Sequence, residues 1–184
     1  MEPHSILNLN ERVSCFVDFM KPAARIVTED VINKLYNMNF FTAPAAIKHH
    51  GNYTGGLFDH SLAVTETLLL YTEQLELEWD RLESPYLVGM FHDLCKTDDY
   101  VMVKQGWEYN KNKTLVGHGD KSVIMLQRLL GQPLTEQEIL CIRWHMGAFD
   151  EKENWNAYGQ AVAEDQNVLY THTADMYASR VAGV

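Results

Sequence analysis

The sequence is poor in cysteine, and it lacks both a long apolar run and a secretory signal. Its three cysteines, Cys15, Cys95 and Cys141, lie far apart without a CxxC pair, which argues against a disulfide framework and favours a reducing compartment. No uninterrupted apolar run approaches the length of a membrane span, and the first residues carry no apolar signal segment. We therefore expect a cytoplasmic protein that does not engage a membrane.

Positive charge is also scarce. The chain has 15 lysines and arginines against 25 acidic residues, for a formal net charge of −10. Long nucleic acids are bound through many basic contacts, so a long nucleic-acid partner is not expected. A small anionic substrate needs only one or two cations and a bound metal ion, which dominates the local field. The oligomeric state stays open at this point.

Length and apolar spacing predict the fold. With 184 residues and 46% hydrophobic content, the chain suits one compact domain over residues 1–184, loosely ordered over about residues 1–10. Helical spacing of apolar residues predicts an all-α bundle of six or more helices. The predicted helices cover residues 11–20, 28–38, 58–77, a segment ending near 92, and 122–130, 135–146 and 166–182. Alternation around the Gln105–Gly106 turn predicts a small hairpin or flap within residues 99–116.

Histidines and aspartates recur at expected helix ends and beside glycines. The candidate metal ligands are His60, His92, Asp93, His118, His145 and Asp175. Imidazoles and carboxylates together suit a divalent metal of intermediate hardness. A carboxylate such as Asp93 can bridge two ions, and two ions can clamp an in-line attack on phosphorus. Each residue alone has an ordinary structural explanation, and His172 is open as a ligand, a supporting partner or a core residue.

Five segments carry a family resemblance. They are GGLFDHSLAV (55–64), FHDLCK (91–96), GHGDKS (117–122), RWHMG (143–147) and HTADMYAS (172–179). Together they resemble the HD-domain metal-dependent phosphohydrolase superfamily. The resemblance covers residues 40–184 and is nearest to the branch with a glycine pair before the first histidine, which includes the catalytic domain of bacterial 3′→5′ exoribonucleases.

The resemblance implies a compact HD-domain bundle that holds two divalent transition-metal ions. The first ion would be held by His60, His92, Asp93 and Asp175. Asp93 would also bridge to a second ion held by His118 and His145. Several relatives have another histidine where Met146 stands, so we expect a weaker second site. The metal stays open among manganese, iron, zinc, cobalt and nickel.

Further residues are predicted to contact substrate. Lys96 follows Asp93 in the family's HDxxK pattern and is expected to hold a phosphate oxygen or to orient Asp93. His50, ten residues before His60, is a candidate general acid or a loop-stabilising residue. Arg143 and Lys121 flank predicted ligands and are candidate phosphate contacts. Asp93, Lys96 and His50 thus form the predicted catalytic set.

The function that the resemblance implies is hydrolysis of a phosphomonoester or phosphodiester bond by a metal-bound hydroxide. The expected substrate is a small phosphorylated compound, a nucleotide or a short oligonucleotide, so the enzyme would be a nucleotidase or a phosphodiesterase. Two alternatives stay open. One is an HD-fold binding or regulatory module without catalysis, and the other is a di-iron oxygenase.

Overall fold

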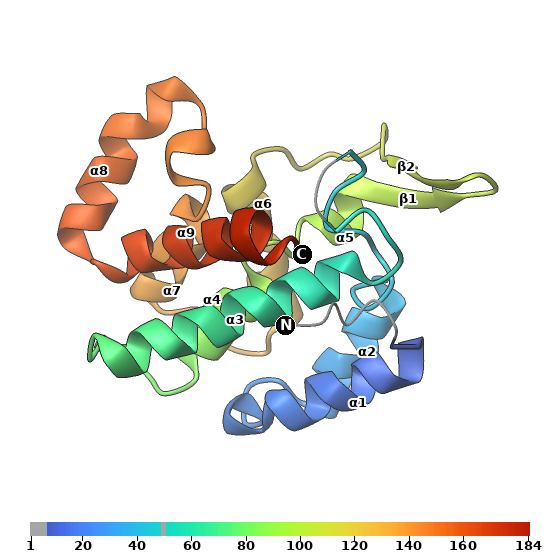
Figure 1. Ribbon diagram of the computed structural model, residues 1–184, viewed down its shortest axis with the longest axis horizontal. Helices are drawn as coiled ribbons and strands as arrows, with labels where there is room; N and C mark the ends of the chain where they lie inside the picture. The colour runs from blue at the N-terminus through green and yellow to red at the C-terminus, as the bar shows by residue number, and fades with distance from the viewer. Residues whose placement is uncertain (1–6, 49–50) are drawn as a thin grey trace.

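The computed structural model describes residues 7–48 and 51–184, and most of these residues are helical. The elements in chain order are α1 (Leu9–Phe19), η2 (Lys21–Ala23), α2 (Glu29–Asn37), α3 (Gly56–Gln74), α4 (Ser84–Phe91), α5 (Lys96–Asp99), β1 (Tyr100–Val103), β2 (Gly106–Tyr109), α6 (His118–Leu129), α7 (Glu136–Trp144), η3 (Gly147–Phe149), η4 (Lys152–Asn154), α8 (Trp155–Glu164), α9 (Asn167–Tyr177) and η5 (Ala178–Ala182). Figure 1 shows α3 crossing the middle of the molecule, with α9 and η5 packed beside it. The predicted helical character is confirmed.

The predicted flap is a two-stranded antiparallel hairpin. β1 pairs with β2 in the register Tyr100 to Tyr109 and Val103 to Gly106. Gly106 has a φ of 123°, which a residue with a side chain rarely adopts, so the turn falls where the sequence predicts it. In Figure 1 the hairpin projects away from the helices.

The first helix starts earlier than the sequence predicts. Asn8 and Glu11 form a capping box, in which each side chain accepts a hydrogen bond from the other residue's main-chain N–H. Leu9 and Asn10 therefore belong to α1, although we expect them in the loosely ordered start. Residues 1–6 lie outside the described part of the chain.

The sequence analysis does not predict two of the observed helices, and a third helix differs in form from its prediction. In α8 only Ala161 is buried and Gly159 interrupts the segment, so no apolar stripe marks this helix. The four-residue α5 is too short to show a period. The last predicted helix is α-helical only to Tyr177 and continues as the π-helical turn η5.

A cluster of phenylalanine rings joins the two helices that carry the first predicted ligands. Phe58 near the start of α3 and Phe91 at the end of α4 are both fully buried. Phe40 contacts both rings, at centroid distances of 6.5 and 5.9 Å. Large buried aromatic rings contribute strongly to a core and hold their neighbours in place. The cluster therefore fixes the chain two residues before His60 and one residue before His92.

Close approach of α3 and α4 depends on Gly89. A Cβ atom at this position would lie 2.6 Å from the Cα of Thr65, so a side chain would force the two helices apart. The helices cross here because Gly89 has none. Although α3 is rich in apolar residues, neither it nor another described helix combines the length and apolar character needed to cross a membrane.

Candidate metal centre

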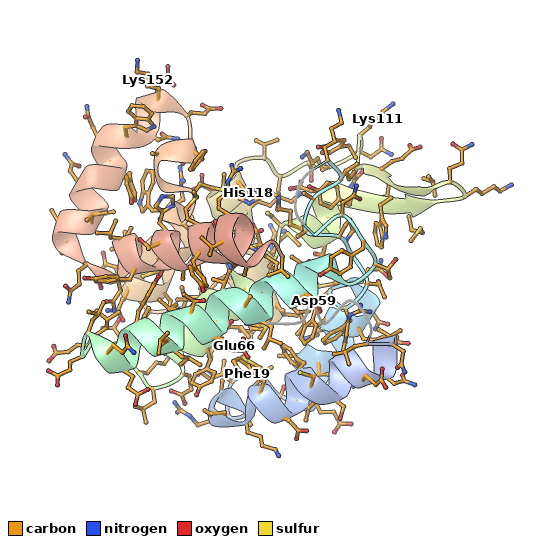
Figure 2. All side chains as sticks on the ribbon, viewed as in Figure 1. Phe19, Asp59, Glu66, Lys111, His118 and Lys152 are labelled. Carbon is orange, nitrogen blue, oxygen red and sulfur yellow. The ribbon has the colours of Figure 1, made fainter. Side chains whose placement is uncertain are left out.

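Five separate elements bring the six predicted ligands into one buried cluster. His60 lies in α3, His92 follows the last residue of α4, and Asp93 comes next. The other three ligands are His118 at the start of α6, His145 just after α7, and Asp175 in α9. Figure 2 shows His118 in the interior of the view, whereas Lys111 and Lys152 lie at the edges of the molecule.

Asp93 stands at the centre of the cluster and divides it. Its Oδ2 lies 3.8 Å from Nε2 of His60 and 3.8 Å from Nε2 of His92. Its Oδ1 lies 2.5 Å from Nε2 of His118 and 3.5 Å from Nε2 of His145. Each carboxylate oxygen of Asp93 therefore faces two imidazole nitrogens.

Asp175 closes the side of the cluster that Asp93 Oδ2 faces. Its Oδ1 lies 3.2 Å from Nε2 of His60, and that nitrogen is also 3.2 Å from Nε2 of His92. Two nitrogens and two carboxylates thus converge on one small volume. Contacts between α3 and α9 bring Asp175 to this place. The sequence motif around Asp175 does not by itself determine this position.

The outer ring nitrogens of three histidines are held by main-chain carbonyl groups. The Nδ1 contacts are His60 with the oxygen of Val184 at 3.0 Å, His92 with Gly89 at 2.8 Å, and His145 with Ile142 at 2.7 Å. A carbonyl oxygen only accepts hydrogen bonds, so each Nδ1 carries the proton that it donates. In a neutral ring the lone pair is then on Nε2, which faces the cluster, as in metal-bound histidines.

The buried polar atoms fit a bound cation. Nε2 of His145 is buried and, among the described residues, has no hydrogen-bond partner. Its lone pair would face Asp93 Oδ1 across 3.5 Å, and two acceptors at that separation repel each other unless a proton or cation lies between them. A metal ion would satisfy both atoms, and the donor set of nitrogen and oxygen suits a divalent transition metal.

Electrostatics in the cluster favour ionised aspartate, and they affect His92 and His60 in opposite directions. Burial lowers the pKa of His92 to about 4, which keeps the ring neutral and its lone pair available. Burial alone would raise the pKa of Asp93, but the nearby charges of Lys96 and His118 prevail and hold it well below its usual value. For His60, burial is the largest single influence and lowers the pKa, but the hydrogen bond and charge of Asp175, the charge of Asp93 and the contact with Val184 together raise it. The cluster thus attracts positive charge.

Three overlapping groups of side chains within the cluster could hold a metal ion. They are His60–His92–Asp93, His92–His145–Asp175 and Asp93–Cys95–His118, each with ligand atoms within 4.8 Å of one another. Cys95 is a ligand candidate that the sequence analysis does not name. Its position two residues after Asp93 is the sequence signal that could have identified Cys95 as a candidate.

His118 is the least firmly held of the four histidines. Its Nδ1 faces the sulfur of Cys95 at 3.4 Å rather than a carbonyl oxygen, and its side chain is 25% exposed. Burial raises the pKa of the Cys95 thiol, so this group stays protonated and is a weak hydrogen-bond acceptor. The ring of His118 is therefore oriented less strongly than the other three.

We expect two metal ions to bind with unequal affinity for this reason. Supporting partners around metal ligands typically change affinity by about 10–100-fold, so the ion at His118 should bind at least about tenfold more weakly. Calorimetric titration of metal-free protein with manganese or zinc checks this. Cys95→Ser should change the weaker site and leave the tighter one unchanged. Two sites of equal affinity would contradict the prediction.

Lys96 differs from the other cations that we predict to contact substrate. It is half-buried, and among the residues described it has no carboxylate within 4.0 Å; its Nζ lies 5.8 Å from the ring centroid of Tyr100. Burial is the largest single influence and lowers its pKa, but the charge of Asp93, together with smaller contributions from Cys95, Tyr100 and Asp99, raises the pKa overall, so the ammonium is charged. An unpaired cation beside the cluster is suited to an anionic ligand.

Lys121 and Arg143 are already engaged with carboxylates. Lys121 pairs with Asp98 at 2.5 Å and Asp99 at 2.9 Å. Arg143 pairs with Asp120 and, at 3.0 Å, with Asp150. Neither cation lines the cavity that Asp93 and Lys96 share, so the geometry gives the predicted phosphate contact of Arg143 no support. Lys121 lines another cavity together with His118, and its phosphate contact stays a prediction. His50 lies outside the described residues, and its role stays a prediction.

A cavity of about 150 Å³ opens beside the cluster. Asp93, Lys96, His118 and Asp175 form one part of its wall, and Phe149 and Arg180 form another. Sequence reasoning missed these last two residues, because no motif includes them. Met146, predicted to be a poor ligand, also lines the cavity.

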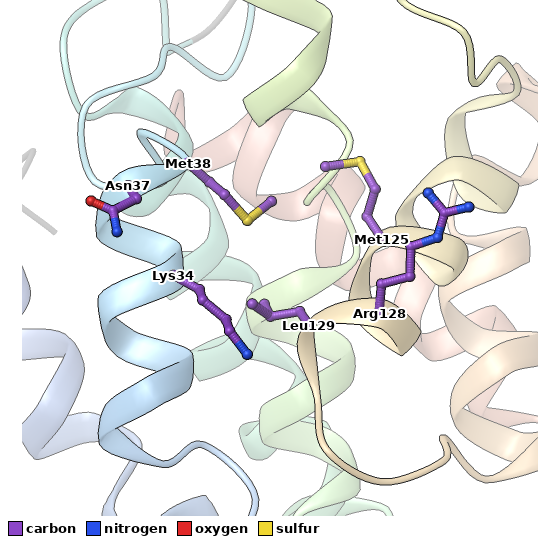
Figure 3. Close-up of a pocket in the computed structure, with 6 residues that line it drawn as sticks. All are labelled: Lys34, Asn37, Met38, Met125, Arg128 and Leu129. Atoms are coloured by element: carbon purple, nitrogen blue, oxygen red, sulfur yellow. The ribbon is translucent and has the colours of Figure 1, made fainter.

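A second cavity lies between α2 and α6 and differs in chemistry. Its volume is about 360 Å³, and Figure 3 shows Met38 and Met125 extending toward each other across it. Among the described residues its lining includes the cations Lys34 and Arg128 but no histidine, cysteine or carboxylate. It therefore cannot supply the ligands of a metal centre.

The glycine pair before His60 has a structural explanation. Gly55 has a φ of 91°, and a Cβ atom there would lie 2.1 Å from the guanidinium carbon of Arg12. Arg12 is buried, donates to the main-chain oxygen of Thr54 at 2.9 Å, and lies 3.8 Å from Asp59. The start of α3 is thus anchored on α1 by a residue that the sequence analysis did not single out.

His172 supports the cluster rather than entering it. Its Nδ1 lies 2.7 Å from the main-chain oxygen of His145, so it holds the turn that carries this candidate ligand.

Comparisons of the chain with protein-family models, with curated proteins and with solved structures find no match, so a function has to be inferred from the geometry of the candidate metal centre itself.

Proposed function

We propose that the protein is a metal-dependent phosphohydrolase that acts on small phosphorylated compounds. One observation carries the proposal: each oxygen of the buried Asp93 faces two imidazole nitrogens, and Lys96, which has no carboxylate partner among the described residues, lies at the cavity beside it. This arrangement is consistent with the two ligand sets that the family resemblance implies. Lys96 adds a cation that can bind the substrate.

The ligands divide into two sets around Asp93. His60, His92, Asp175 and Asp93 Oδ2 would hold one ion, and His118, His145 and Asp93 Oδ1 the other. Bound ions of this kind bring the pKa of water toward neutrality and stabilise negative charge on phosphoryl oxygens. The chain's own contribution is to orient the imidazoles through their carbonyl partners and to keep Asp93 ionised.

Lys96 binds a non-bridging oxygen of the phosphoryl group in this proposal. Within residues 7–48 and 51–184 its ammonium has no carboxylate to leave when substrate arrives, so binding there exchanges no ion-pair partner. The leaving oxygen takes its proton from water at the open side of the cavity, or from His50. The attacking water supplies the new oxygen on the phosphorus of the product.

We expect Lys96→Ala to lower kcat/KM by about 10²-fold, the effect of losing a charge-assisted hydrogen bond of roughly 3 kcal/mol. Metal content should stay unchanged, because Lys96 is not a ligand. Steady-state kinetics and elemental analysis of the same preparation check both statements. Lys111→Ala, at an exposed lysine far from the cavity, is the matched control. Loss of metal would show that Lys96 acts on Asp93 instead, and normal kinetics would remove it from the site.

The small size of the cavity and the acidic chain favour small substrates over long RNA. A cavity of about 150 Å³ is smaller than the roughly 300–1,000 Å³ of sites that enclose a whole drug-sized ligand, so it suits a phosphoryl group rather than a polymer. A net charge of −10 repels a polyanion. A mononucleotide or dinucleotide meets both conditions.

A screen for phosphate release tests the function. Metal-free protein is supplied with manganese, iron, zinc, cobalt or nickel and offered p-nitrophenyl phosphate, bis(p-nitrophenyl) phosphate, mononucleotides, cyclic dinucleotides and short RNA. We expect hydrolysis that a chelator abolishes and that Asp93→Asn lacks. Metal binding without hydrolysis of any ester would favour a binding module. An iron absorption band that changes with oxygen would favour the oxygenase.

A further inference from the structure

Only part of a substrate can enter the cavity, and the larger part of the substrate has to stay outside it. The metal ligands, Lys96 and a space of about 150 Å³ accept a phosphoryl group with its surrounding water. Binding sites that enclose a whole drug-sized ligand measure about 300–1,000 Å³. The group attached to phosphorus must therefore lie at the rim, and the rim residues decide which esters bind well.

Two exposed side chains meet at this rim. Phe149 ends η3, four residues after His145, and its side chain is 57% exposed, which is unusual for a phenylalanine. Arg180 lies in the π-helical turn η5, and its guanidinium carbon is 5.7 Å from the centroid of the Phe149 ring. Both residues line the cavity that contains Asp93 and Lys96. π-helical turns are rare and recur at functional sites.

The turn that carries Phe149 is fixed although its ring is exposed. The next residue, Asp150, accepts hydrogen bonds from Arg143 at 3.0 Å and from Asn154 at 3.2 Å. The indole N–H of Trp155 donates to the main-chain oxygen of Asp150 at 3.4 Å. These contacts hold the backbone in place without covering the ring. An exposed aromatic ring on a fixed turn provides a stacking surface whose position does not depend on the ligand.

Arg180, like Lys96, has no carboxylate partner in the part of the chain that the structure describes. The two cations come from different parts of the chain, α5 and η5, and both line the same small cavity. An anion with several oxygens can be bound by both. Asp93 and Asp175 line the same cavity, so such an anion enters it only where metal ions and these cations offset the two carboxylates.

We propose that this site takes a nucleoside monophosphate, with Phe149 stacking against the base and Arg180 and Lys96 holding the phosphate. The inference rests on the proposed phosphohydrolase function and names its substrate class. Water attacks phosphorus, the bond between phosphorus and the nucleoside oxygen breaks, and one proton of water passes to that oxygen. The products are a nucleoside and inorganic phosphate, so no oxidant or co-reactant is required.

The test compares adenosine 5′-monophosphate with ribose 5-phosphate, which has the same phosphate but no base. In the metal-loaded protein we expect kcat/KM to be about tenfold or more higher for the nucleotide, the effect of one stacked base. Phe149→Leu should remove this preference and leave ribose 5-phosphate unaffected, whereas Phe149→Trp should keep it. Arg180→Ala should lower kcat/KM for both compounds. Tyr36→Leu and Arg128→Ala, at exposed positions outside this cavity, are the matched controls.

Calorimetric binding of the same two compounds separates this inference from the proposed function. If no phosphate ester is hydrolysed, the proposed function fails, but tighter binding of the nucleotide that Phe149→Leu abolishes still supports the base contact. If both compounds bind and react equally well, or if Phe149→Leu weakens both alike, the base contact is overturned. In that case a functioning phosphohydrolase would select its substrate elsewhere.

Discussion

Asp93→Ala should lose most of its bound metal and at least about 10³-fold of its hydrolytic activity, a change of roughly 4 kcal/mol in the activation barrier. The carboxylate of Asp93 faces His60 and His92 with one oxygen, and His118 and His145 with the other. Removing it takes a ligand from both predicted ions at once. Elemental analysis and phosphate release, measured on the same sample, check the two effects together.

A matched control separates this effect from general loss of structure. Asp18 is exposed and pairs with Lys21 on the surface, so Asp18→Ala should keep metal and activity. Circular dichroism should show helical content near that of the unmodified protein in both variants. Unchanged metal content in Asp93→Ala would contradict the assignment of Asp93 as the shared ligand.

Removing the metal should lower the thermal stability of the protein by about 10 °C. A ligand at about 1,000 times its Kd stabilises the native state by roughly 4 kcal/mol, and a chain of this size shifts by about 2–4 °C per kcal/mol. Without a cation, the buried carboxylate of Asp93 faces the lone pair of His145 across 3.5 Å, and the carboxylate of Asp175 lies close to the same histidine. Calorimetric melting curves with and without a chelator measure the difference.

The Asp93→Ala variant is the control for this experiment, because a protein that binds little metal should respond little to a chelator. Adding back manganese or zinc should restore the Tm of the unmodified protein. A Tm that does not depend on chelator or metal would show that the cluster is stable without an ion and has another explanation.

The sequence predicts where the candidate ligands lie along the helices better than it predicts their surroundings. His60, His92 and Asp93 lie at helix ends that the periodicity of apolar residues locates to within a few residues. His118 and His145 lie at the start of α6 and just after α7, which the same signals place. Short-range patterns are sufficient here because the ligands are tied to the ends of regular elements.

Long-range contacts explain what the sequence does not predict. A basic residue next to a ligand in the sequence is not necessarily free to bind substrate. Carboxylates hold Lys121 and Arg143, whereas Lys96 has no such partner among the described residues. The exposure of Phe149 and the turn that positions Arg180 depend on how η3 and η5 pack, and no local period reveals them. The rim of the cavity is therefore visible only in three dimensions.

Metal-dependent phosphate release is the measurement that tests the central claim most directly. Metal-free protein is reloaded stepwise with manganese or zinc, and the initial rate of phosphate release from a nucleoside monophosphate is followed against bound metal per chain. We predict no release without metal and a rate that rises until about two ions are bound. Phosphate release that is independent of metal content, or its absence at full metal loading, would contradict the account.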